Sequence, residues 1–209
     1  MNKITRAEYK EFCDESVKEW REKYYRRWLP EMQQPNSTPN TPMECFFKYY
    51  TQGSPSNFNN ALRCYEKIDE CFACPCVTQE MYYEAIEEIS KNKLPENVVT
   101  YRYVRETILE MMLKWSRVRY LRKGSVIFDK AFISTTLTPK TVQDRLYVHK
   151  AKKRLVIYVP EGTPCVYLEL IANMNENELL FAPRTKLRII SAKPFCKDVE
   201  CIIEANANP

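Results

Sequence analysis

The sequence predicts an α+β protein in which helices come first and strands follow. Through most of residues 1–95, apolar side chains recur every three or four positions, which is the helical period. From residue 96 onward, short runs rich in β-branched and aromatic residues alternate with turn residues, as strands do. Helices grouped before strands indicate α+β rather than an alternating α/β order. We therefore expect a helical N-terminal lobe over residues 1–95 and a β-rich core over residues 96–209, in one compact domain.

The first expected helix covers residues 5–28, where Thr5 and Glu8 have capping-box spacing. Its apolar residues form one stripe, and its basic residues lie off that stripe. Either simple solvation or docking on an acidic partner explains the basic face. After a proline-rich stretch, residues 43–50 are rich in aromatic side chains, and a further break follows. Helical patterns then lie at residues 57–70 and 78–91, the second with Thr78 as its N-cap.

Strand patterns are concentrated in the second half of the chain. One helical pattern interrupts them at residues 105–117, and Thr138 followed by Pro139 predicts another helix start. The expected strands are short and several are separated by only a few residues; they cover residues 98–104, 125–128, 131–137, 155–159, 163–170, 178–181, 186–191 and 199–204.

The composition narrows the classes of function. A net charge of +5 permits an acidic partner and predicts no nucleic-acid partner. No run of about eighteen apolar residues occurs, so we expect no membrane span, and the oligomeric state stays open. The polar N-terminus predicts no secretory signal. The expected location is the cytoplasm, or the cytosol of a host cell into which the chain is delivered.

The nine cysteines and the single histidine limit the chemistry further. Without a secretory signal, the cysteines are expected to be mostly reduced. Cys71 and Cys74 have the spacing of half a zinc site, with Cys64 and Cys76 nearby, but a second pair of standard spacing is missing. Scattered thiols are the main interpretation, and a metal site is the alternative. His149 lies in a basic stretch, which disfavours Ser-His or Cys-His catalysis. Only three glycines are present, and no phosphate-loop fingerprint occurs.

Three features of the β-rich half suggest a site. Arg102 lies within an apolar strand pattern, where a guanidinium needs an anionic partner, and arginine binds phosphate in a bidentate manner. Ser134 begins a run of three hydroxyl residues, which can orient a neighbouring carboxylate through hydrogen bonds. Glu176 and Glu178 lie two residues apart, and the strand period of two lets their side chains point the same way. Each feature alone also fits an ordinary surface.

In their order and flanking residues, these features resemble the mono-ADP-ribosyltransferases of the Arg-Ser-Glu class. That class includes actin-modifying bacterial toxins and arginine-specific ecto-enzymes of vertebrates. The resemblance covers about residues 98–204. Its most specific parts are residues 124–136, which resemble the second motif with its lead-in, and residues 178–190, which resemble the last strand and its return. The resemblance implies a mixed β-sandwich of the ADP-ribosyltransferase type and NAD as the substrate.

The resemblance also implies roles for single residues. Arg102 would bind the phosphates of NAD, and Ser134 would hold Glu178 by a hydrogen bond. Glu178 would contact the nicotinamide ribose and stabilise its oxocarbenium-like transition state. The nicotinamide pocket would be shaped by Thr135 and Thr136.

The acceptor side of the reaction depends on Glu176, which would orient an arginine of a target protein and help to deprotonate it. Phe132 and Tyr103 are expected beside the nicotinamide, although Tyr103 stands where a smaller residue is frequent in the family. The loop at residues 171–175 lacks the aromatic residue that some members use for target recognition. The alternatives are therefore NAD hydrolysis or a non-arginine acceptor, and, outside enzymes, a binding module that docks through its basic first helix.

Overall fold

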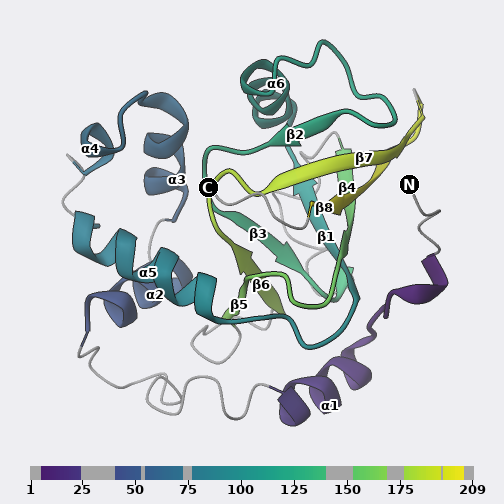
Figure 1. The fold of residues 1–209 in the computed structure, drawn as a ribbon, viewed down its shortest axis with the longest axis horizontal. Coiled ribbons are helices and arrows are strands. Elements are labelled where there is room, and N and C mark those ends of the chain that lie inside the picture. Colours follow the sequence, from purple (N-terminus) through teal and green to yellow (C-terminus); the bar gives the residue numbers. More distant parts are fainter. Residues whose placement is uncertain are drawn as a thin grey trace.

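The computed structural model describes residues 6–24, 41–52, 55–72, 77–139, 153–168, 177–193 and 195–204 (Figure 1). After a short 3-10 turn at Arg6–Glu8, the helices are α1 (Asp14–Tyr24), α2 (Pro42–Gln52), α3 (Pro55–Cys64), α4 (Ile68–Cys71), α5 (Gln79–Lys91) and α6 (Glu106–Trp115). The strands are β1 (Val98–Val104), β2 (Val126–Phe128), β3 (Ile133–Thr136), β4 (Lys153–Val159), β5 (Val166–Tyr167), β6 (Glu178–Phe181), β7 (Lys186–Ala192) and β8 (Asp198–Ile203).

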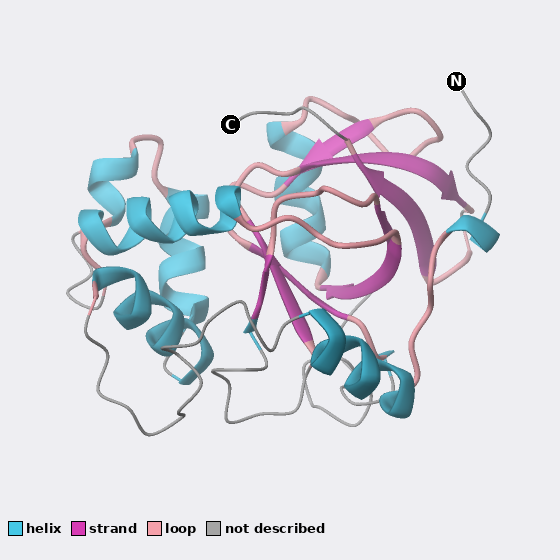
Figure 2. Ribbon diagram, turned by 60° about the horizontal axis from the view of Figure 1, so that its bottom comes forward, coloured by secondary structure: helices cyan, strands magenta, loops and turns pink. Residues whose placement is uncertain are grey.

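The strands form one continuous sheet in the order β2-β7-β8-β4-β1-β3-β6-β5. Neighbours are antiparallel except β4 and β8, which are parallel. The two halves of the sheet meet where β1 pairs with β3 through a single residue pair, Tyr101 and Thr136. The sheet folds over at this junction, and the two halves face each other (Figure 2). The predicted α+β class is confirmed, and the expected sandwich is this folded sheet.

The main hydrophobic core lies between the two halves of the sheet. Strands with a buried inner face alternate apolar residues with partly exposed ones, as β8 does from Val199 to Ile203. Residues from both halves belong to one cluster, which is why the halves stay together; its members include Ile133, Leu179 and Phe181 from one half and Leu155, Ile157, Leu187, Ile189 and Val199 from the other.

A second core fixes the helices α2, α3 and α5 against the outer face of β3, β6 and β5 (Figure 1). It is rich in aromatic rings: Phe132 lies 5.1 Å from Phe46, 5.8 Å from Tyr50 and 5.8 Å from Tyr82, measured between ring centroids. Burying such rings contributes several kcal/mol, about 3–5 kcal/mol for each ring lost to alanine. The helical part before residue 95 therefore docks on the sheet beside β3.

The first helix begins later than predicted, at Asp14 instead of residue 5. The reason is tertiary, because Lys10 forms a parallel bridge to Val98 at the start of β1 and takes this segment out of helical geometry. The helix cap lies at Cys13, whose backbone N–H donates to Ser16 Oγ at 2.9 Å. The predicted stripe is confirmed at Val17 and Trp20, which are buried in the main core rather than in the core of the other helices. Residues 25–28 lie outside the described part.

Most other predicted elements match to within two residues, and two do not. The helical pattern at residues 57–70 is divided into α3 and the short α4. The strand pattern at residues 163–170 yields only the two-residue β5 in the described part. The helix start predicted at Thr138 leads into residues 140–152, which lie outside the described residues. No described helix is long and apolar enough to cross a membrane.

Seven cysteines lie in the described part, and all of them are free thiols. No group of three or more histidine, cysteine, aspartate or glutamate side chains in that part is arranged to hold a metal ion. Cys74 and Cys76 of the predicted cluster lie outside the described residues. Cys165 and Cys201 are fully buried, and burial raises the pKa of both thiols above the ordinary value of 9.0.

We expect the free energy of unfolding to fall as pH rises above 9.0, the ordinary thiol pKa. The thiols of Cys165 and Cys201 then ionise in the unfolded chain but stay protonated in the folded one, so each lowers stability by up to about 1.4 kcal/mol per pH unit. Urea unfolding between pH 8 and pH 10 measures this slope. Cys165→Ala should flatten it, whereas the exposed thiol variant Cys64→Ala should not; equal slopes in all three proteins would contradict the assignment.

Candidate active site

Three neighbouring strands carry the residues that the sequence singled out. Arg102 lies on β1, Ser134 lies on β3, and Glu178 is the first residue of β6. Thr136 is paired with Tyr101 of β1 and, across the other edge of β3, with Glu178. The predicted motifs, far apart in the sequence, therefore meet at the junction of the two halves of the sheet.

The strand register decides which side chains share a face. Glu178 lies directly opposite Thr136. Ser134, two residues before Thr136 on β3, has its side chain on the same face of the sheet. Thr135 points to the opposite face, and its hydroxyl donates to the carbonyl oxygen of Leu179 at 3.2 Å. Glu178 is 8% exposed, so its carboxylate is held in a largely desolvated place. The predicted bond from Ser134 to Glu178 stays a prediction, since the directly opposite hydroxyl is that of Thr136.

Asn177 holds the chain immediately before Glu178. Its side-chain oxygen accepts from the Tyr167 hydroxyl at 2.9 Å, and its amide donates to Thr138 Oγ1 at 2.8 Å. Its φ angle of 48° is left-handed, a conformation that asparagine tolerates better than most residues. The backbone thus enters β6 through a buried clamp that orients Glu178. Glu176 lies outside the described residues.

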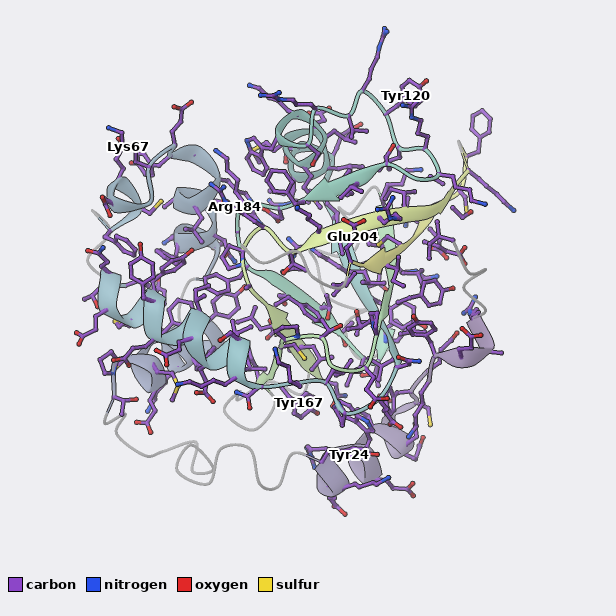
Figure 3. The ribbon with its side chains drawn as sticks, in the orientation of Figure 1. Tyr24, Lys67, Tyr120, Tyr167, Arg184 and Glu204 are labelled. Carbon is purple, nitrogen blue, oxygen red and sulfur yellow. The ribbon has the colours of Figure 1, made fainter. Side chains whose placement is uncertain are left out.

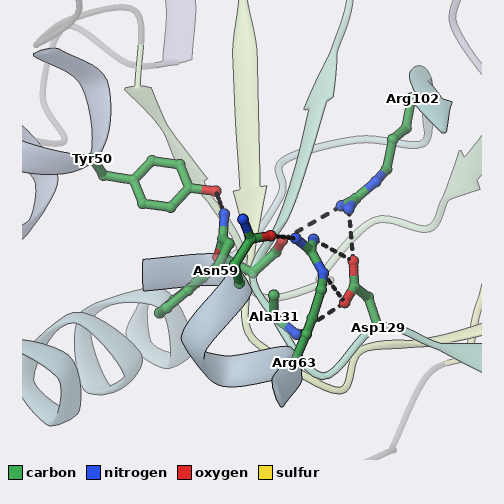
Figure 4. A network of polar contacts seen from close by, with 8 residues as sticks. Tyr50, Asn59, Arg63, Arg102, Asp129 and Ala131 are labelled. Atoms are coloured by element: carbon green, nitrogen blue, oxygen red, sulfur yellow. Dashed lines mark hydrogen bonds and ion pairs between the residues drawn. The ribbon is translucent and has the colours of Figure 1, made fainter. Parts of the chain in front are cut away.

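The guanidinium of Arg102 is bound to a buried carboxylate that the sequence analysis did not single out (Figure 4). Its Nη2 donates to Asp129 Oδ2 at 2.7 Å, and its Nη1 donates to the carbonyl oxygen of Phe132 at 3.4 Å. Arg63 of α3 reaches the same carboxylate, with Nη2 2.8 Å from Oδ2 and Nε 3.0 Å from Oδ1. The backbone N–H of Ala131 completes the set at 3.0 Å. Asp129 is 0% exposed.

Among the described residues, this hydrogen-bonded group carries one more positive charge than negative charge. Two guanidinium groups share one carboxylate, so the group of Arg63, Arg102 and Asp129 carries a net charge of about +1. Burial lowers the pKa of Arg102, the charge of Asp129 raises it, and the charge of Arg63 lowers it further. Arginine stays protonated at neutral pH despite such effects. A bound phosphate group would supply the missing negative charge.

Tyr50 of α2 lies near this cationic group (Figure 4). Its hydroxyl accepts a hydrogen bond from the Asn59 amide at 3.0 Å. Burial raises the pKa of Tyr50, the negative charge of Glu178 raises it further, and the positive charges of Arg102 and Arg63 lower it. The charges of Glu178 and of the two arginines therefore both influence the Tyr50 hydroxyl. A single buried region thus holds two guanidinium groups, the carboxylates of Asp129 and Glu178, and a neutral hydroxyl.

Two other predicted site residues have different surroundings. Phe132 is 1% exposed and packs among the rings of the second core, where it supports the start of β3. Tyr103 follows Arg102 in the strand and points to the opposite face, where it lies across from Arg154. Their predicted contacts with nicotinamide stay predictions.

Four residues of this site, Arg63, Asp129, Asn59 and Tyr50, were not predicted from the sequence, although part of the signal is present there. Asp129 follows a predicted strand and precedes an apolar one, so it is a carboxylate expected in a buried turn. Arg63 lies in an amphipathic helix, and nothing in the sequence distinguishes it from a solvated arginine. Only the docking of α3 against the loop before β3 makes it part of the site.

A family model described as ADP-ribosyltransferase exoenzyme matches residues 17–207. The fold is similar to that of Plx2a, an ADP-ribosyltransferase toxin from Paenibacillus larvae, with a TM-score of 0.64 and 18% identity over 93% of this chain and 98% of that chain. It is similar to the C3 exoenzyme of Clostridium limosum, with a TM-score of 0.67 and 15% identity over 94% and 98%.

A third similar structure is C3stau2 from S. aureus, which was solved with NAD; the TM-score is 0.66 and the identity 16%, over 95% of this chain and 100% of that chain. No curated protein sequence matches the chain. At these identities the structural likeness shows the fold alone. The match to the family model is a match of the sequence itself.

Proposed function

Because the chain belongs to the ADP-ribosyltransferase exoenzyme family, an NAD-dependent group of enzymes, we propose that it transfers ADP-ribose to an arginine of a target protein. Nicotinamide is the other product. The observation that carries this proposal is the gathering of Arg102, Arg63 and Glu178 around one buried region beside Tyr50. NAD is the substrate of this family. Its negatively charged pyrophosphate matches the two arginines, and its nicotinamide ribose matches the carboxylate.

The two arginines are proposed to bind the pyrophosphate of NAD. Their guanidinium groups are held by Asp129 at 2.7 and 2.8 Å, so they are positioned before the substrate arrives. Each guanidinium keeps further N–H donors that are directed by this fixed geometry, and phosphate oxygens accept such bonds strongly. The net positive charge of the group favours a ligand with two negative charges.

Glu178 is proposed to stabilise the reacting ribose. As the bond between the ribose and nicotinamide breaks, its electron pair leaves with nicotinamide, and positive charge develops on the ribose ring oxygen and anomeric carbon. A carboxylate that is largely desolvated lowers the free energy of that charge more than one in water does. The hydroxyls of Ser134 and Thr136, on the same face, are proposed to keep the carboxylate in place.

Glu176 is proposed to act on the acceptor. A guanidinium is fully protonated at neutral pH and attacks carbon poorly, so a carboxylate that takes its proton has a clear task. The nitrogen then bonds to the anomeric carbon, and the proton passes to Glu176. Water in place of arginine would give NAD hydrolysis, and another side chain would give a different linkage; these remain the competing functions of the same site.

Labelled NAD incubated with the protein and a cell lysate tests this proposal. We expect label in a protein band, and mass spectrometry of that band should place ADP-ribose on arginine. Release of the label by hydroxylamine supports an arginine linkage. Label on another residue would exclude the arginine acceptor while keeping the transferase, and nicotinamide release without labelled protein would favour hydrolysis.

The cellular location follows from the target and is proposed in two forms. The free thiols of the described part suit a reducing compartment. The protein would act in the cytosol of the cell that makes it or, as a toxin or effector, in that of a host cell. Lysates of both cell types in the same labelling experiment distinguish the two.

A further inference from the structure

We propose that the end of the molecule opposite the helices α2–α5 is a docking surface for membranes rich in anionic phospholipid. Two segments form this surface, which we name the basic rim. One is the loop of residues 117–124 between α6 and β2, and the other is the tip of the hairpin between β7 and β8, with Lys193, Phe195 and Lys197. The two segments lie side by side in Figures 1 and 2.

Backbone hydrogen bonds hold the two segments of the basic rim together. Gly124 at the end of the loop donates to the carbonyl oxygen of Ile189 at 2.8 Å, and Ile189 donates to that of Ser125 at 2.8 Å. Strand β7 continues from Ile189 directly to the hairpin tip. The rim is therefore a feature of the folded sheet, with its position set by β2 and β7.

The charge of the basic rim has one sign. The loop contains four cations and no carboxylate, and the described hairpin tip contains two lysines and no carboxylate. The acidic side chains at the two ends of β8 have partners of their own: Asp198 accepts from Arg154 at 2.8 and 2.6 Å, and Glu204 is paired with Arg188. The exposed cations of the rim are Arg117, Arg119, Arg122, Lys123, Lys193 and Lys197.

Two aromatic side chains protrude among these cations. Phe195 is 104% exposed and Tyr120 is 58% exposed, so two of the four large apolar side chains that are exposed in the described part lie on the rim. The Arg122 guanidinium lies 5.8 Å from the centre of the Tyr120 ring, which keeps this ring beside a cation. The free energy of a fully exposed phenylalanine side chain falls when the side chain moves from water into an apolar phase. Such a residue between two lysines suits the interface of a bilayer.

An anionic bilayer fits this combination better than the other polyanions. Single-stranded nucleic acid binds in a groove that follows its backbone, whereas these residues occupy the protruding tips of a loop and a hairpin. A flat anionic surface contacts both protruding tips at once and accepts the aromatic rings. Each cation near such a surface raises the binding affinity about fivefold. Helix α3, which carries Arg63, lies on the other side of the molecule from the hairpin tip (Figure 1), so docking through the rim does not cover α3.

Sedimentation with vesicles tests the basic rim. We expect binding to vesicles of phosphatidylcholine with about one-third phosphatidylserine, weaker binding at high salt, and none to phosphatidylcholine alone. Lys193→Glu with Lys197→Glu should weaken the binding at least about 25-fold, since two cations are lost at about fivefold each. The matched control is Lys67→Glu with Lys18→Glu, which changes the net charge equally on α1 and beside α4, far from Tyr120 (Figure 3); it should bind nearly as the unaltered protein does.

The aromatic residues distinguish a membrane from a soluble polyanion. Phe195→Ser should weaken vesicle binding severalfold but leave binding to heparin unchanged, and Tyr83→Ser, which alters another exposed aromatic side chain, should change neither. NAD cleavage in solution should be the same in all these variants, which shows that they are folded. No binding to anionic vesicles, equal losses in the two charge variants, or loss of heparin binding with Phe195→Ser would each overturn the proposal.

Discussion

Replacing Asp129 by asparagine is expected to lower the free energy of unfolding by about 3–5 kcal/mol, because it leaves two buried guanidinium groups without their common anion. Asp129 is fully buried and bound by Arg63 and Arg102, whose side chains are 8% and 11% exposed. Neither cation has solvent to replace the carboxylate, and the two repel each other across the vacated charge. Urea unfolding at neutral pH measures the loss.

The chain contains a matched control for this change. Asp198 also accepts two hydrogen bonds from one arginine, at 2.8 and 2.6 Å, but its side chain is 36% exposed. Asp198→Asn is therefore expected to cost no more than about 1 kcal/mol. Equal losses of unfolding free energy in the two variants would contradict the claim that burial makes the Asp129 carboxylate the more stabilising of the two.

A double-mutant cycle separates charge repulsion from lost packing. Arg63→Met alone should destabilise the protein, because it removes one partner of Asp129. In the Asp129→Asn background the same change should cost less or even stabilise, since it removes one of two repelling cations. Additive effects would contradict a shared carboxylate. NAD should bind more weakly in all these variants, because Asp129→Asn removes the carboxylate that holds Arg102 and Arg63→Met removes one of the two proposed phosphate-binding guanidinium groups.

Replacing Glu178 by glutamine is expected to lower the rate of NAD cleavage and of transfer by about a thousandfold, with little change in stability. The amide has the shape of the carboxylate but lacks the negative charge that would stabilise the ribose cation. Because Glu178 is 8% exposed at the start of β6, water cannot replace that charge. Nicotinamide release and label transfer, measured together with a thermal melt, separate a lost charge from lost folding.

Glu176→Gln is expected to behave differently, because its proposed task concerns the acceptor alone. Transfer to protein should be lost while part of the NAD hydrolysis remains. Glu161→Gln, on the exposed turn after β4, serves as the control and should keep both activities. Equal losses of both activities in the Glu176 and Glu178 variants would refute the division of roles.

Local patterns predicted elements well where local and tertiary preferences agree. The bounds of β1 and β6 match the prediction, because both are short runs of strand-forming residues whose side chains are mostly buried on both faces of the sheet. Thr78 caps α5 as predicted, since a cap depends only on neighbouring backbone groups. The start of α1 was wrong because Lys10 pairs with a strand some ninety residues away, and no local pattern contains that contact.

The sequence by itself determined the order of the motifs around Arg102, Ser134 and Glu178, and through their flanking residues it indicated the family. Those features are encoded in residues that are neighbours in the chain. The tertiary structure alone brings Asp129 between Arg102 and Arg63 and places Tyr50 where the charges of these arginines and of Glu178 act on its hydroxyl. The reason is that α2 and α3 reach these residues by packing aromatic rings onto the outer face of β6 and onto Phe132, just before β3. Such packing depends on the shapes of the side chains and on the area they bury, and neither can be predicted from the spacing of residues along the chain.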